Sequence, residues 1–300
     1  MKVVVTGGTG FLGRRLLAAL LRKGHEVAVV TRDPGTAVVP KGARAVSWSD
    51  LATAVDGAGG VVNLAGETIA QRWTASAKAR IAGSRASAAE RVGAALRAAR
   101  GRPGVLVNAS AVGFYGNRGN EELTETSGPG TGFLAETTVA WEEAARRAAP
   151  AGVRLVLPRI GVVLGEDGGA LSKMLLPFRL GLGGPLGSGT QWMPWIHRDD
   201  LVGLLVAALE DPRFEGPVNA TAPGPVTMRE FASTLGRVLH RPAFAPAPAF
   251  AIRAAMGEMA ALVLDGQKAL PTKASSLGFR FLFESLEPAL REILDRSSRG

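Results

Sequence analysis

Along residues 1–31 the pattern of apolar and polar positions changes from a continuous apolar run to a helical spacing and then back to a continuous apolar run. Residues 2–6 and 26–31 are short, continuous apolar runs rich in valine, which is typical of strands buried on both faces. Between them, four leucines recur at helical spacing, and this pattern stops at Gly24. The sequence therefore predicts a strand, a turn, a helix and a second strand.

The same alternation of short apolar runs and longer helical patterns continues to residue 165. Further strands are expected at 60–66, 105–110 and 153–165, and helices at 75–100 and 133–148. Strands that alternate with helices build a doubly wound parallel sheet with helices on both faces. The expected fold class is therefore α/β, of the Rossmann type.

The pattern changes after residue 165, which indicates a second unit. We expect residues 1–165, together with about 195–222, to form a dinucleotide-binding domain. Residues from about 166–194, together with 223–300, are then expected to form a smaller α+β domain on the substrate side.

Three glycines follow the first predicted strand at the spacing Gly7-x-x-Gly10-x-x-Gly13. One glycine permits a tight turn, one lets a pyrophosphate approach backbone N–H groups, and one lets the helix pack against the strand. The helix begins beside them, so its positive end faces the phosphates. Because the triplet lies between a strand and a helix, it predicts a dinucleotide-binding site.

The end of the second strand indicates which dinucleotide binds. An acidic residue there accepts the ribose 2′-hydroxyl of NAD, whereas an arginine accommodates the 2′-phosphate of NADP. This strand ends with Thr31 and Arg32, and the planar guanidinium of Arg32 can pair with a phosphate. Asp33 comes one position later and is expected to point elsewhere. We predict NADP (NADPH) as the cofactor; the alternative is that Arg32 is only a solvated loop charge.

Composition narrows the range of partners. The chain has 300 residues and no cysteine, so it contains no disulfide, zinc–thiolate site or thiol nucleophile, and we expect no metal site. The formal net charge is +9, but the basic residues are dispersed and no nucleic-acid motif is found, so we expect no nucleic-acid partner. The longest apolar stretch, 247–265, is interrupted by Arg253 and Glu258, so we expect no membrane partner either. The chain begins directly with a strand rather than a signal peptide, and we expect a cytoplasmic monomer or homodimer.

Several motifs together resemble one superfamily. They are the glycine triplet, Asn63-Leu64-Ala65-Gly66, Ser110-x-x-x-x-Tyr115-Gly116 and Trp195-Ile196-His197-x-Asp199-Asp200-Leu201. With them, the chain resembles the extended short-chain dehydrogenase/reductases. The runs 63–67, 176–185 and 264–268 narrow the resemblance to an atypical branch of NADP-dependent epimerase/dehydratase-like proteins with a conserved C-terminal domain of unknown function. The resemblance covers essentially the full chain.

The resemblance implies a set of cofactor contacts and a small-molecule substrate bound between the sheet edge and the C-terminal part. Arg72 and His197 are the candidate substrate contacts, although His197 could instead anchor a loop and Arg72 could instead form an ion pair with Glu67. The implied cofactor contacts are Gly7, Thr9, Gly10, Phe11, Leu12, Gly13, Thr31, Arg32, Leu64, Ala65, Gly66, Glu67, Arg80, Arg85 and Gly161.

The chain departs from the superfamily at its catalytic pair. Ordinary members use a Tyr-x-x-x-Lys pair on the helix after the fifth strand, where the lysine lowers the pKa of the tyrosine. The single tyrosine here, Tyr115, precedes that helix, and Gly119 follows it four residues later. Glu136 and Ala140 fall about where the pair belongs, so the usual dyad is absent.

Two functions remain open. In the first, NADPH supplies a hydride to a carbonyl reductase or epimerase reaction, and another side chain supplies the proton. Glu136, whose pKa would rise if it were buried beside an apolar cleft, Tyr115 and Ser110 are the candidate catalytic residues, with Glu67 and His197 as further candidates. In the second, the protein is a non-catalytic NADP-binding sensor or scaffold.

Overall fold

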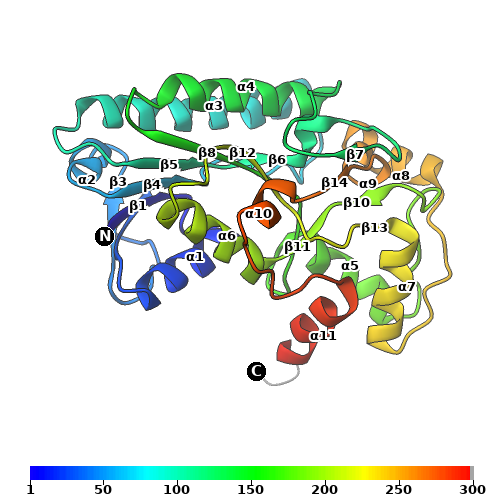
Figure 1. Ribbon diagram of the computed structural model, residues 1–300. Helices are drawn as coiled ribbons and strands as arrows, with labels where there is room; N and C mark the ends of the chain where they lie inside the picture. Colours follow the sequence, from blue (N-terminus) through cyan, green and yellow to red (C-terminus); the bar gives the residue numbers. More distant parts are fainter. Residues whose placement is uncertain (298–300) are drawn as a thin grey trace.

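A parallel sheet of eight strands lies at the centre of the protein, whose computed structural model describes residues 1–297 (Figure 1). Its strands are β1 (Lys2–Thr6), β2 (Glu26–Thr31), β3 (Ala43–Ser47), β4 (Gly60–Asn63), β5 (Val105–Asn108), β6 (Ser110–Ala111), β8 (Arg154–Ile160) and β12 (Gly216–Ala220). They are ordered β12-β8-β5-β4-β1-β2-β3, and β6 also pairs with β8. β1 lies between β2 and β4, which is the doubly wound order, so the predicted fold class is confirmed.

Helices cover both faces of this sheet (Figure 1). They are α1 (Phe11–Arg22), α2 (Leu51–Val55), α3 (Ala75–Ala98), α4 (Phe133–Ala148) and α6 (Arg198–Glu210). Successive residues of a strand point to opposite faces, and β1 follows this rule. Val3 and Val5 pack with leucines of α1 and α6, whereas Val4 packs with α2 and α3. The continuous valine run is therefore explained by burial on both sides.

The remaining elements gather beyond the carboxyl ends of the strands. They are η1 (Val112–Tyr115), β7 (Glu122–Leu123), β9 (Val162–Leu164), α5 (Gly169–Arg179), β10 (Trp192–Met193), β11 (Trp195–His197), β13 (Val226–Thr227), α7 (Met228–Leu239), α8 (Ala249–Met256), η2 (Gly257–Ala260), α9 (Ala261–Leu264), β14 (Lys268–Ala269), α10 (Thr272–Ser276) and α11 (Leu286–Ser297). α5, α7 and α11 share a separate apolar cluster built around Leu175, Phe231 and Leu290. In contrast, Ala274 of α10 packs into the cluster of the main sheet. The exact division into two domains stays a prediction.

His197 holds the start of α6. α6 begins at Arg198, and its N-cap residue is His197, whose Nδ1 accepts the backbone N–H of Asp199 at 3.1 Å. Asp199 pairs through both carboxylate oxygens with Arg15 of α1, at 2.7 and 2.9 Å. The Nε2 of His197 lies 3.0 Å from Oε2 of Glu292 on α11. His197 thus anchors α6 and α11, as the alternative interpretation of this residue expected.

Asp200, also in the first turn of α6, is buried and holds the segment before α11. Its carboxylate accepts the backbone N–H groups of Leu282 and Phe283 at 2.6 and 3.1 Å. Burial raises the pKa of Asp200 to about 6, although these two hydrogen bonds act in the opposite direction.

We expect this raised pKa to make stability depend on pH. The folded protein holds the Asp200 proton more tightly than the unfolded chain, so this contribution to stability is complete below about pH 4 and is lost as the pH rises through about 6. Asp200→Asn should therefore flatten the fall in the free energy of unfolding over this interval. Urea unfolding of the wild-type protein and of Asp200→Asn at several pH values across this interval measures the effect. If the two free energies of unfolding changed in parallel with pH, the raised pKa of Asp200 would be contradicted.

Candidate functional site

The β1–α1 turn is too tight for side chains at two of its glycines. Gly7 has a φ of +70°, and a Cβ there would lie 2.7 Å from the carbonyl carbon of Leu64, just after β4. A Cβ on Gly13 would collide with the carbonyl oxygen of Gly7 and would lie 2.6 Å from the backbone of Gly8. α1 begins at Phe11 after Gly10, which offers no side-chain cap, and the first turn of α1 contains no acidic residue. The N–H groups at this positive helix end are therefore left for an anionic group, as a pyrophosphate cradle requires.

A pocket of about 350 Å³ lies at the end of β2 and shares Thr9 with the glycine turn. Arg32 lines it, as the sequence led us to expect for a phosphate-binding residue, and so does Arg14 from α1. Asp33 also lines it, but its carboxylate accepts a backbone N–H and a hydroxyl of its own loop, at 3.1 and 2.9 Å. Arg14 and Arg32 come from different parts of the chain and line one pocket, a suitable arrangement for a phosphate.

Sequence reasoning missed Arg14. Its position just after the glycine triplet carries no signal by itself, because an exposed arginine in the first turns of a helix is common on protein surfaces. Its nearness to Arg32 depends on the parallel pairing of β1 with β2, which brings the start of α1 beside the end of β2.

Two arginines of α3 shape the segment after β4. Arg80 Nε lies 3.1 Å from Oε1 of Glu67, and Arg85 Nη1 donates to the carbonyl oxygen of Glu67 at 3.0 Å. The guanidinium of Arg85 also lies 5.0 Å from the ring centre of Trp141 on α4. The ion pair considered between Glu67 and Arg72 is not formed, because Arg80 takes that place and Arg72 is exposed. Hydrogen bonds from a neighbouring glutamine and from Arg80 lower the pKa of Glu67, so its carboxyl is a poor proton donor.

Other positions expected to contact the cofactor lie at close crossings of the backbone. A Cβ on Gly161, between β8 and β9, would collide with the carbonyl oxygen of Pro194. A Cβ on Gly168, after β9, would lie 2.6 Å from the ring of Phe11. The guanidinium of Arg198 stacks on the same ring, 4.9 Å from its centre. The loop after β9 therefore closes over the start of α1, and direct contact of these residues with a dinucleotide stays a prediction.

The inner face of α4 differs from the face that the sequence suggested. Glu136 and Ala140 are exposed, so the structure does not bury Glu136 beside an apolar cleft. Leu134 and Thr138 turn inward instead, because a shift of two residues turns a helix by about 200°. A Cβ on Gly113 of η1 would lie 3.3 Å from Cβ of Leu134 and 3.6 Å from the hydroxyl of Thr138. A Tyr-x-x-x-Lys pair that faces the strand ends would occupy these two positions, which carry no acid–base group of that kind.

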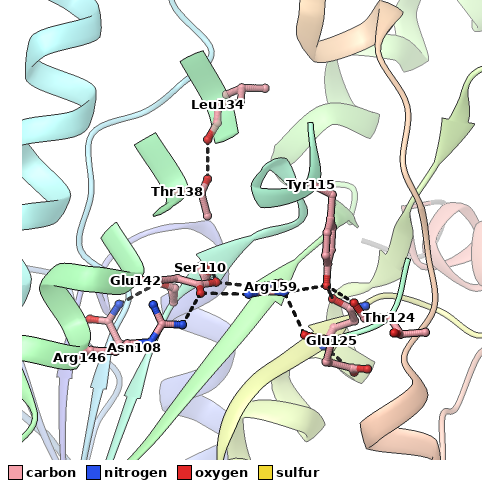
Figure 2. Close-up of polar contacts among 12 residues, drawn as sticks. Asn108, Ser110, Tyr115, Thr124, Glu125, Leu134, Thr138, Glu142, Arg146 and Arg159 are labelled. Atoms are coloured by element: carbon pink, nitrogen blue, oxygen red, sulfur yellow. Dashed lines mark hydrogen bonds and ion pairs between the residues drawn. The ribbon is translucent and has the colours of Figure 1, made fainter. Parts of the chain in front are cut away.

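A buried polar network lies next to this face of α4 (Figure 2). Glu142 is fully buried, and its carboxylate pairs with Arg159 of β8 through two contacts of 2.8 and 3.1 Å. Ser110 donates its hydroxyl to Glu142 at 2.7 Å, and Nη1 of Arg159 donates to the hydroxyl of Tyr115 at 3.0 Å. Arg159 is only 2% exposed, so the two opposite charges compensate each other inside the protein.

This network engages the hydroxyl groups that sequence analysis named as proton donors. The proton of Ser110 is directed at Glu142, and the hydroxyl of Tyr115 lies 2.9 Å from the carbonyl oxygen of Thr124 and 2.7 Å from Oδ1 of Asn219. Burial raises the pKa of Tyr115, and the charge of Arg159 only partly offsets this effect. Tyr115 is therefore a buried aromatic residue whose hydroxyl is held by hydrogen bonds. Its pKa is not lowered, as acid–base catalysis by a tyrosine would require.

We expect Tyr115→Phe to be a modest stability variant. It removes the hydrogen bonds of one hydroxyl while the ring stays buried, so the free energy of unfolding should fall by about 1 kcal/mol. Denaturant unfolding measures this loss. If the variant kept its stability but lost turnover of a substrate identified for the protein, a catalytic role for Tyr115 would replace the structural one.

Glu142 and Arg159 were also missed by sequence reasoning, although a signal was present. Glu142 lies at helical spacing from Ala135, Thr138 and Ala145 on the buried face of α4, and Arg159 follows the apolar run 155–158 inside β8. A charge on an apolar face indicates a buried partner of opposite sign. The sequence alone could not identify the partner, since the two residues lie on different elements.

Neither a metal-binding cluster nor a membrane-spanning helix is found in the part of the chain that the structure describes. Within residues 1–297, no group of three or more acidic or histidine side chains that could hold a metal ion is found. In the same part of the chain, no helix is both long enough and apolar enough to cross a bilayer.

Comparisons with known proteins agree with this geometry. Residues 3–220 match the model of the NAD dependent epimerase/dehydratase family, and residues 247–293 match a domain of unknown function. The chain is 45% identical to the chloroplastic epimerase family protein SDR39U1 homolog of Arabidopsis thaliana, over 98% of this chain and 87% of that protein. It is 39% identical to the epimerase family protein YfhF of Bacillus subtilis, over 98% of both chains. A crystal structure of human epimerase family protein SDR39U1 with NADPH superimposes with a TM-score of 0.91 at 39% identity, covering 98% of this chain and 99% of that one.

Proposed function

Because this chain belongs to the NAD-dependent epimerase/dehydratase family, we propose that it binds NADPH at the β1–α1 turn. The start of α1 would hold the pyrophosphate, and Arg14 and Arg32 would hold the 2′-phosphate. The observation that carries this proposal is the pocket lined by these two arginines, which adjoins the glycine turn through Thr9. The NADPH-containing structure of the human relative supports it.

The residues present fit a phosphorylated dinucleotide in three respects. Gly7 and Gly13 leave no room for side chains, so the backbone of the turn is bare where a pyrophosphate would approach. The first turn of α1 has no acidic residue to repel the phosphates. Asp33 is held by its own loop, so it does not offer its carboxylate to a ribose in the way an NAD-specific acid does.

We further propose that the protein is an NADPH-dependent oxidoreductase of the epimerase family, a carbonyl reductase or epimerase that acts on a small molecule. Bound NADPH would supply the hydride. The protein would hold the substrate at the carboxyl ends of the strands without a tyrosine–lysine relay, because Leu134 and Thr138 occupy the inner face of α4. With Ser110 and Tyr115 engaged in the buried network, the proton would come from solvent or from the substrate itself.

A second function is favoured by one specific observation. The side chains expected to donate a proton are either exposed, as Glu136 is, or hydrogen-bonded to other protein groups, as Ser110, Tyr115 and His197 are. This arrangement suits a non-catalytic NADPH-binding sensor or scaffold.

One experiment separates the two functions. Purified protein is titrated with NADPH, and a panel of aldehydes and ketones is then added while the nicotinamide absorbance is followed. Oxidation of NADPH that depends on a carbonyl compound supports the reductase. Tight binding without consumption, with and without the panel, supports the sensor, and failure to bind NADPH overturns both. Location in the cytoplasm and a monomeric or dimeric state stay predictions.

A further inference from the structure

Two stretches of the chain contain none of its acidic residues. Residues 168–198 and 231–257 have no Asp or Glu, although the chain contains 26 of them. The same stretches carry exposed basic side chains, which are Lys173, Arg179, Arg237, Arg241 and Arg253. The charged side chains of these two segments are therefore all basic.

The fold places these two stretches side by side. The loop after α5 runs along the segment between α7 and α8, which follows the right-hand edge of the view in Figure 1. Ala245 donates its N–H to the carbonyl oxygen of Gly183 at 3.2 Å, and Gly187 donates to that of Ala247 at 2.8 Å. A Cβ on Gly181 would lie 3.4 Å from Pro242. Two separate segments without acids thus form one continuous surface.

Large apolar side chains protrude from this surface. Leu180 and Leu182 are 65% and 68% exposed, and Phe244 is 80% exposed. Leu176, one turn before Leu180 on α5, and Phe250, at the start of α8, are also exposed. These five are among eight exposed large hydrophobic side chains in the part of the chain whose side chains are described. We call the group formed by Leu176, Leu180, Leu182, Phe244, Arg179 and Arg241 the basic–apolar surface.

A pocket of about 700 Å³ adjoins the basic–apolar surface and shares Arg241 and Phe244 with it. Arg237, His240 and Arg291 also line it. Glu287 binds both Arg237 and Arg291, at 3.0 and 2.6 Å, and so holds two guanidinium groups at the rim. Arg241 has no ion-pair partner among the described side chains. The pocket therefore keeps an excess of positive charge next to protruding apolar groups.

We propose that the basic–apolar surface docks on an anionic lipid bilayer. Leucine and phenylalanine side chains would enter the boundary between headgroups and acyl chains, while the arginines pair with lipid phosphates, and Arg241 and its pocket take one headgroup. A second copy of the chain is a poorer partner, because the excess positive charge of two such surfaces would repel. An anionic bilayer presents negative charge over a wide area, and it therefore complements both the excess positive charge and the apolar side chains of this surface. This contact would lie on the membrane surface, so the proposal departs from the expectation that no membrane is a partner.

Flotation of the full-length protein with vesicles tests the proposal. We expect binding to vesicles of phosphatidylglycerol and phosphatidylcholine, no binding to vesicles of phosphatidylcholine alone, and release by high salt. Arg179→Gln and Arg241→Gln should each weaken binding to the anionic vesicles roughly fivefold. Leu180→Ser and Leu182→Ser should each weaken it roughly tenfold or more. Excess glycerol phosphate should not compete, because a free phosphate lacks the apolar part of the contact.

Matched variants outside the surface serve as controls. Leu282→Ser removes a side chain that is 71% exposed, and Arg44→Gln removes a charge on β3, so neither should change vesicle binding. Circular dichroism confirms that each variant is folded, independently of any NADPH site. No binding to anionic vesicles, equal binding to neutral vesicles, equal losses in the control variants, or full competition by glycerol phosphate would each overturn the proposal.

Discussion

Arg32→Ala is expected to weaken NADPH binding by about 1.5–3 kcal/mol, which is roughly 10- to 150-fold in Kd, while NADH binding stays almost unchanged. The difference arises because only NADPH carries the 2′-phosphate that would enter the pocket bordered by Arg32. Isothermal titration of each coenzyme into both proteins measures the two affinities. Arg14→Ala should act in the same direction, with a smaller loss if Arg32 makes the bidentate contact.

The control for Arg32 is Arg44, an exposed arginine on the neighbouring strand β3 that does not line the pocket. Arg44→Ala removes the same charge from the overall field of the protein, so it should leave both affinities nearly unchanged. Equal losses of NADPH and NADH affinity in Arg32→Ala would show that Arg32 does not contact the 2′-phosphate.

Glu142→Ala is expected to lower the free energy of unfolding by about 3–5 kcal/mol. The variant leaves Arg159 charged and 2% exposed without its carboxylate, and it removes the acceptor of the Ser110 hydroxyl. A loss of this size is a large part of the stability of a typical protein. Urea or thermal unfolding followed by circular dichroism gives the difference.

The adjacent Glu143 provides a matched control, since it lies on the same helix but is exposed. Glu143→Ala should change stability by less than about 0.5 kcal/mol. Joint replacement of the pair by apolar residues, Glu142→Leu with Arg159→Met, should recover stability relative to Glu142→Ala, because no charge is left buried without a partner. A loss in Glu142→Ala no greater than in Glu143→Ala would show that the buried pair contributes nothing.

The parts of this fold that depend on local sequence were predictable. The valine runs of β1 and β2, with the glycine triplet between them, identified the doubly wound sheet and the cradle, because the period of a strand and the lack of a Cβ act within a few residues. α4 was predicted with its observed ends, Phe133–Ala148. Arg32 was identified as a pocket residue because its distance from the turn is set by one helix and one strand.

The parts that depend on tertiary contacts were not predictable. The expected inner position on α4 was wrong by two residues, since the side of the helix that faces the sheet is set by packing against Gly113 and β8. Tyr115 and Asn219 hydrogen-bond across 104 residues of sequence, and no local pattern links them. Asp199 pairs with Arg15 of α1, 184 residues away in the sequence, and no local pattern indicates this partner.

The central claim is that the glycine turn and the arginine-lined pocket beside it bind a phosphorylated dinucleotide. Titration of NADPH and of NADH into the purified full-length protein, followed by calorimetry, tests this claim most directly. The account predicts saturable binding of one NADPH per chain with an affinity at least tenfold above that of NADH, about 1.4 kcal/mol. Retention of neither coenzyme, or a preference for NADH, would contradict it.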